Sequence, residues 1–264
     1  MPFTPSHALV ALPFIRTPLV ASAIAIGAMT PDLPLFLRGI GVSYSFTHGV
    51  ANVVWTAVIA FALFLVWRTV LRPAVGELTP RWLARRLPGD WDQGGRAALK
   101  SAVGIGSNRP WFPVALGVSL LLGVLSHIAW DLFTHEGRWG VDLLPALDRM
   151  WGPLLGYKWL QYGSTAVGLL GIGIWALLRL RRATPREIQR SVPDGIRIAW
   201  WVSLPTFLLV AAVLGYLLYG PFTTEFTVQH LGYRMLPPAC AVWGFLTLGL
   251  CLAVTVFRRR HQRG

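Results

Sequence analysis

Histidine and aspartate side chains that could bind a metal ion gather in the first half of the chain. His127 and Asp131 are four residues apart, which places both on one face of a helix. If that helix continues for one more turn, His135 joins the same face as a third ligand. Imidazole nitrogen and carboxylate oxygen suit Zn²⁺, Mn²⁺ or Fe²⁺, and a water on such an ion becomes a nucleophile at neutral pH. The spacing therefore predicts a metal site.

Two further candidates lie at the ends of apolar stretches. Asp32 follows one such stretch and His48 precedes the next. Ionisable groups at the ends of membrane spans are candidates for function because their burial is costly. Purely structural roles stay open for the same residues. Asp32 could be a helix N-cap, and His48 could form a hydrogen bond at the end of a helix. The His127–Asp131 pair could be a contact that only holds two helices together. We take Asp32 and Asp131 as the candidate catalytic carboxylates, each able to bridge two ions or to orient a histidine.

The composition places these residues in a membrane protein. Of the 264 residues 54% are hydrophobic and 13% charged, whereas ordinary soluble domains carry about 25% charged residues. The net charge of +13 would indicate nucleic-acid binding in a soluble domain. Here the basic residues fall between apolar stretches, so we expect a lipid bilayer as partner and no nucleic acid. The predicted fold is an all-α, polytopic helical bundle, with residues 1–264 forming a single membrane domain.

Five uncharged stretches each meet the requirement of about 20 apolar residues for a membrane-spanning helix. They cover 49–67, 110–130, 159–178, 198–224 and 235–257, with the last two crossings expected at about 198–222 and 236–257. Loop 68–109 holds eight basic residues, 179–197 holds six and the tail after residue 257 holds four, against five on the opposite side. The positive-inside rule then places loop 68–109 and the C-terminus in the cytoplasm.

The orientation adds weaker candidates for the site. Arg38 and Arg138 lie on the same outer side as the histidines and could contact a phosphate group. Asn52, Gln161 and Tyr162 could support the ligands through hydrogen bonds.

The N-terminal apolar region, 5–31, does not fit a simple crossing. Pro5, Pro13 and Pro18 interrupt it. It forms either a short sixth span or a helical hairpin that is broken at residues 13–18 and enters from the outer side. A broken backbone is tolerated at membrane depth when protein buries it.

Several segments resemble a known family. They are PFTPSH at 2–7, GAMTPDLP at 27–34, FTHG at 46–49, SHIAWDLFTH at 126–135 and LQYGS at 160–164. They look like the DUF4184 family of bacterial membrane proteins of unknown function. The pattern is also similar to the YdjM-like family, described as membrane-bound predicted metal-dependent hydrolases. More distantly, it resembles helical zinc phospholipases C and P1-type nucleases, which carry more ligands than this chain offers.

The resemblance implies a multi-pass protein of the bacterial cytoplasmic membrane and adds His7 to the ligands. The full ligand set is then His7, Asp32, His48, His127, Asp131 and His135, holding one or two divalent ions, with zinc favoured. In one continuous helix His7 and Asp32 would be about 37 Å apart, from 25 steps of about 1.5 Å. A hairpin lets both reach the outer face, so we favour the hairpin.

The favoured function is metal-dependent hydrolysis of an ester or phosphoester at the outer face of the membrane, where a lipid-like substrate could enter from the bilayer. Whether the protein is an enzyme stays open. A transporter or metal-ion carrier and a non-catalytic scaffold are the alternatives. The later spans carry few polar residues, which argues against a transport path. We expect no nucleotide or flavin, and the sequence does not define an oligomeric state.

Overall fold

The N-terminal apolar region folds back on itself. In the computed structural model, which describes residues 3–39 and 41–261, it forms the 3-10 helix η1 (Thr4–Phe14) and the α-helix α1 (Ala21–Met29), which contact each other. Pro13 and Pro18 lack the backbone N–H that a continuous α-helix needs. The hairpin is therefore the alternative that the chain adopts, and the continuous crossing is not.

The rest of the described chain is almost entirely helical, as the predicted all-α class requires. Its one sheet is a two-residue antiparallel pair that joins Met150 to Leu155 and Trp151 to Leu154. The elements are η2 (Thr30–Asp32), α2 (Leu33–Phe36), α3 (Tyr44–His48), η3 (Val50–Asn52), α4 (Val53–Val66), η4 (Trp67–Leu71), α5 (Arg72–Leu78), α6 (Arg81–Ala84), η5 (Gly89–Asp92), α7 (Gly95–Val103), α8 (Phe112–Thr134), α9 (Trp139–Leu143), η6 (Pro145–Asp148), β1 (Met150–Trp151), β2 (Leu154–Leu155), α10 (Gly156–Arg182), α11 (Asp194–Tyr219) and α12 (Val228–His261).

Five helices of the described chain are long and apolar enough to cross a membrane, as predicted. They are Val50–Leu78, Phe112–Thr134, Gly156–Arg182, Asp194–Tyr219 and Val228–Arg258.

The ends of these helices differ by several residues from the predicted stretches. The first continues past 67 to Leu78 through a π-helical turn, η4, that ends just before Arg72 and Pro73. Arg72 in this extension is paired with the Asp90 carboxylate at 2.9 Å. The fourth ends at Tyr219 because Gly220 adopts φ +82°, which a helix cannot continue.

The chain divides into two compact units. Unit 1 comprises Met1–Leu33, Val42–Leu65 and Val103–Arg182. Unit 2 comprises Pro34–Gly41, Val66–Ala102 and Ala183–Gly264.

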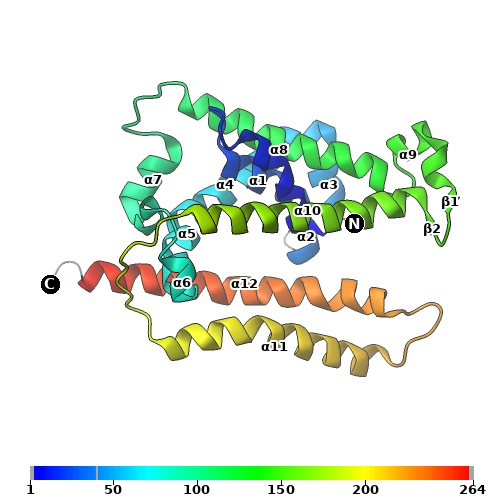
Figure 1. The fold of residues 1–264 in the computed structure, drawn as a ribbon. Helices are drawn as coiled ribbons and strands as arrows, with labels where there is room; N and C mark the ends of the chain where they lie inside the picture. Colours follow the sequence, from blue (N-terminus) through cyan, green and yellow to red (C-terminus); the bar gives the residue numbers. More distant parts are fainter. Residues whose placement is uncertain (1–2, 40, 262–264) are drawn as a thin grey trace. The chain divides into compact units, whose positions relative to one another are not determined.

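Unit 1 is held together where glycines let helices approach closely. A Cβ on Gly123 of α8 would lie 2.3 Å from the Ile24 carbonyl oxygen of α1. A Cβ on Gly168 of α10 would lie 2.7 Å from the Ser6 Cβ of η1. The N-terminal hairpin therefore lies between α8 and α10 (Figure 1). This position brings the end of α1 beside the second half of α8.

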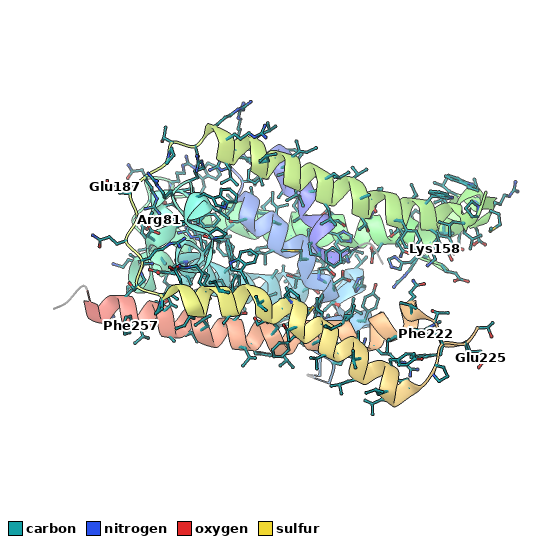
Figure 2. The ribbon with its side chains drawn as sticks, turned by 60° about the horizontal axis from the view of Figure 1, so that its bottom comes forward. Arg81, Lys158, Glu187, Phe222, Glu225 and Phe257 are labelled. Carbon is teal, nitrogen blue, oxygen red and sulfur yellow. The ribbon has the colours of Figure 1, made fainter. Side chains whose placement is uncertain are left out.

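Unit 2 contains an antiparallel pair formed by α11 and α12 (Figure 1). Figure 2 shows Phe222 and Glu225 in the loop that joins the two helices. Arg81, Glu187 and Phe257 lie at the other end of the pair (Figure 2). Segments that the sequence assigns to one side of the membrane thus gather at one end of this unit.

A buried carboxylate, Glu77, ties that end of unit 2 together. Its Oε2 accepts hydrogen bonds from the backbone N–H groups of Ser191 at 2.9 Å and Val192 at 3.2 Å. The Arg197 Nε donates to the Glu77 carbonyl at 2.7 Å, and the Arg258 Nε lies 3.6 Å from Glu77 Oε1. Several arginines of the basic loops therefore have partners within the protein.

Candidate metal centre

Five of the predicted ligands form one buried cluster in unit 1. His7 comes from η1, Asp32 from η2 and His48 from the last position of α3, while His127 and Asp131 come from α8. Their side chains are at most 6% exposed. We refer to these five residues as the His/Asp cluster.

Four ligand atoms of the cluster converge at the spacing that one metal ion requires. His127 Nε2 lies 3.2 Å from His48 Nε2, 3.6 Å from Asp32 Oδ1 and 3.4 Å from Asp131 Oδ2. His48 Nε2 lies 3.8 Å from the same Asp32 oxygen and 3.4 Å from the same Asp131 oxygen. Two ligands bound to a tetrahedral zinc ion at 2.0–2.1 Å are themselves about 3.3 Å apart. The observed set is close to this value.

The hydrogen bonds of the two imidazoles fix which nitrogens are free. His127 Nδ1 lies 2.7 Å from the Ala28 carbonyl oxygen, and His48 Nδ1 lies 3.0 Å from the Tyr44 carbonyl oxygen. A carbonyl oxygen only accepts, so each Nδ1 carries the proton. In the neutral rings the two Nε2 atoms then present lone pairs to each other. Such a pair cannot form a hydrogen bond, and a cation between the two nitrogens would satisfy both.

Four buried polar atoms in and beside the cluster have no hydrogen-bond partner among the described residues. They are His7 Nε2, Asp32 Oδ1, Asp131 Oδ1 and His135 Nε2. A buried polar atom without a partner costs about 1–3 kcal/mol, and more when it is charged. A divalent cation would also offset the two carboxylate charges. The donor set of the cluster therefore fits a metal ion.

Among the residues that the structure describes, two groups of three could hold a metal ion. One consists of His7, His127 and Asp131, the other of Asp32, His48 and His127, and the ligand atoms within each group lie within 4.8 Å of one another. His127 belongs to both groups, but only its Nε2 is available. It can therefore ligate a single ion. A second ion would depend on Asp131 as a bridge, because Oδ1 lies 4.0 Å from His7 Nε2 while Oδ2 faces the other histidines.

His135 lies beside the cluster without continuing the helix. Helix α8 ends at Thr134, and the His135 backbone is extended at φ −130° and ψ 139°. The additional helical turn considered from the spacing is therefore not formed, because the chain turns away through Gly137 at φ +65°. His135 Nδ1 nevertheless donates to the Asp131 carbonyl at 3.2 Å and lies 3.7 Å from Asp131 Oδ2.

Two polar side chains that orient the carboxylates were not predicted. The Thr4 hydroxyl donates to Asp32 Oδ2 at 2.7 Å. The Tyr44 hydroxyl lies 3.4 Å from Asp131 Oδ2, and its ring stacks on His48 with centroids 3.7 Å apart. The sequence contained a signal for each of them. Thr4 belongs to the N-terminal motif PFTPSH, and Tyr44 lies four residues before His48, which places both side chains on one helix face.

Comparison with known proteins places the chain in a family. The family model described as "Domain of unknown function (DUF4184)" matches residues 1–257. The chain belongs to the DUF4184 family. The match contains the whole His/Asp cluster and confirms, of the resemblances drawn from the motifs, the one to DUF4184. No curated protein and no solved structure matches the chain.

Burial sets the protonation of the ligands outside the spanning helices in this DUF4184 protein. It lowers the pKa of His7 to about 3, so the imidazole is neutral at pH 7 and its lone pair is free for a metal ion. It also raises the pKa of Asp32 and that of Tyr44. Tyr44 thus keeps its proton as a hydrogen-bond donor.

The two arginines proposed for phosphate contact have different surroundings in the DUF4184 chain. Arg138 is half-buried directly before α9, and its charge acts on both Tyr44 and His135. Arg38 belongs to unit 2, where its guanidinium donates to the Tyr233 carbonyl at 2.6 Å and lies over the Tyr233 ring.

The three proposed supporting residues do not bond directly to the cluster. Gln161 is buried, but its Oε1 accepts from Lys158 at 3.3 Å. Tyr162 is 44% exposed, and Asn52 is half-buried in η3. Within the described residues, neither the Asn52 nor the Tyr162 side chain hydrogen-bonds to a cluster residue. Their supporting role stays a prediction.

Thr4→Val is expected to weaken metal binding without removing a ligand. Valine keeps the shape of threonine but leaves Asp32 Oδ2 without its donor, and losing such an outer partner typically lowers metal affinity by about 10–100-fold. Zinc titration of the purified protein measures this change. Thr4→Ser retains the hydroxyl and should bind nearly as wild type does. Equal affinities for the valine variant and wild type would show that Thr4 does not support the site.

Proposed function

We propose that this DUF4184 protein is a metal-dependent hydrolase of an ester or phosphoester. Its site is the His/Asp cluster, with one or two zinc ions. The observation that carries the proposal is the convergence of the His48 and His127 lone pairs with the carboxylates of Asp32 and Asp131. Mixed nitrogen and oxygen ligands without thiolate are typical of catalytic rather than structural zinc sites.

The residues of the cluster would divide the chemical tasks. His48, His127, Asp32 and Asp131 would hold the ion, and a zinc ion held there lowers the pKa of a water ligand to about 7 and so supplies a nucleophile. His135 Nε2 is buried without a described partner and is the group best placed to exchange a proton with the substrate.

Two further side chains would act on the substrate and on the carboxylates. The charge of Arg138, which acts on Tyr44 and His135, would favour a phosphate group beside the cluster. Thr4 would hold Asp32 Oδ2 so that Oδ1 faces the ion, and Tyr44 would donate to Asp131 Oδ2, the oxygen that faces the two histidines.

The site would face the extracytoplasmic side of a bacterial cytoplasmic membrane. In unit 1 the cluster lies toward the end of α8 that adjoins the start of α10 through α9 and η6. The other end of α10 carries Arg179, Arg181 and Arg182. The positive-inside rule assigns such an arginine-rich end, and with it the C-terminal tail, to the cytoplasm.

Elemental analysis and hydrolysis assays on the purified full chain test the proposal. We expect zinc to co-purify and the protein to hydrolyse bis(p-nitrophenyl) phosphate or a p-nitrophenyl ester. Chelation should reduce the rate to background, and added zinc should restore it. Full activity after complete removal of the metal would overturn the proposal.

The same preparation separates the two alternatives. A protein that binds no metal would be a scaffold, although a scaffold gives no reason for four unpartnered polar atoms in one place. A protein that binds zinc, hydrolyses neither substrate and moves zinc into sealed vesicles would be a carrier. Either result would replace the hydrolase proposal.

A further inference from the structure

An apolar cavity of about 670 Å³ lies directly beside the His/Asp cluster in unit 1. Its walls come from η1, α8 and α10, and His7 is part of both the wall and the cluster. The cavity therefore adjoins the candidate metal centre at His7.

The helix geometry explains how the wall extends from His7. A 3-10 helix has three residues per turn, so His7, Val10 and Pro13 form one row along η1. On α10, Trp159, Gly163 and Val167 are spaced by four residues and also share a face. All six residues line the cavity. An elongated apolar group whose polar end is at His7 would follow both rows.

The space beside the glycines of α10 differs along the helix. A Cβ on Gly168 or Gly171 would lie 2.7 Å from atoms of Ser6 or Leu9, so the two helices touch there. One turn before Gly168, a Cβ on Gly163 would meet no atom within 4 Å. Gly163 is thus a position from which a side chain could fill the cavity.

The hydroxyl groups of Ser126 and Ser164 in the wall are already engaged. The Ser126 hydroxyl donates to the Gly123 carbonyl at 2.7 Å, and the Ser164 hydroxyl donates to the Gln161 carbonyl at 3.2 Å while accepting from Trp130 Nε1. A polar solute would find few free partners along this wall, and burying polar groups without partners is costly. An apolar chain meets no such penalty.

We propose that this cavity holds one acyl chain of a bilayer phospholipid, with the ester or phosphoester of that lipid at the His/Asp cluster. The inference rests on the proposed function and names its substrate class. Two of the three walls, α8 and α10, are helices long and apolar enough to span the membrane. The surrounding bilayer therefore supplies the occupant at high local concentration, and the chemistry of a phospholipid matches both ends of the site.

Photo-cross-linking with a lipid probe tests the proposal on the full chain. The protein is placed in phosphatidylcholine nanodiscs that contain a small fraction of phosphatidic acid with a diazirine in one acyl chain. Cross-linked residues are mapped by mass spectrometry. We expect cross-links to concentrate on half-buried cavity residues such as Val10 and Leu160. Their level should exceed that at Leu170 and Ile174, which are exposed on α10 outside the cavity.

A matched pair of variants makes the test specific. Gly163→Leu fills the cavity, so we expect about tenfold less cross-linking at cavity residues, which corresponds to about 1.4 kcal/mol of lost binding free energy. Gly173→Leu adds the same side chain at another open position of α10 that does not line the cavity, and it should behave as wild type. Cavity cross-linking no greater than at Leu170, or unchanged in Gly163→Leu, would overturn the proposal.

The metal content of each sample separates this inference from the function on which it rests. Zinc bound to a wild-type protein whose cavity is not cross-linked would refute the acyl-chain site and leave the metal centre intact. Strong cavity cross-linking in a protein that binds no zinc would instead support the lipid site and refute the hydrolase.

Discussion

Replacing His127 with alanine is expected to reduce bound zinc to the background level. His127 is the residue that both candidate metal groups share, and its Nε2 lies within 3.6 Å of a ligand atom from each of His48, Asp32 and Asp131. Losing a partner that only orients a ligand already costs about 10–100-fold in metal affinity, so loss of this ligand should exceed about 100-fold. Elemental analysis and zinc titration of the purified variant measure the effect.

An exposed histidine provides the control for this variant. His230 lies in unit 2 at the start of α12, where its Nδ1 contacts the Thr227 hydroxyl at 3.0 Å. His230→Ala should retain the zinc of wild type and elute identically on gel filtration. If both variants retained the zinc content of wild type, or if both contained none, the His/Asp cluster would not be the metal site.

Gly123→Ala is expected to abolish zinc binding although it changes no ligand. The added Cβ would lie 2.3 Å from the Ile24 carbonyl oxygen and 2.7 Å from the Ala28 backbone nitrogen, neither of which is a flexible side chain. Overpacking of this kind costs about 1–3 kcal/mol, and here it must move α1 relative to α8. That shift displaces the Ala28 carbonyl, which holds His127, together with Asp32 at the end of the same segment. Both the thermal unfolding midpoint and the zinc content should fall.

Gly117→Ala is the matched control on the same helix. A Cβ at Gly117 would meet no atom within 4 Å, so this variant should unfold at the wild-type temperature and bind zinc normally. Thermal unfolding in detergent, with and without added zinc, compares the two. A Gly123→Ala protein with wild-type stability and zinc content would show that the close crossing of α1 and α8 does not position the site.

Local patterns in the sequence were sufficient for the helical class, the five spanning helices and the His127–Asp131 pair. Each depends on properties that act within one segment. A run of about 20 apolar residues fits the bilayer whatever its neighbours are, and a spacing of four residues aligns two side chains on any α-helix. The motifs were likewise sufficient for the DUF4184 family, because they lie within the stretch that the family model matches.

The tertiary structure alone decided how the separate segments meet. Whether His7 reaches the region of Asp32 depended on the chain reversal after η1, which local spacing left open. The Ala28 carbonyl, which sets the tautomer of His127, is 99 residues away in sequence. Helix α8 ends at Thr134, so His135 does not share a helix face with His127 and Asp131. This end depends on the turn that follows. These features arise from close backbone crossings and long-range hydrogen bonds, whose geometry no single segment contains.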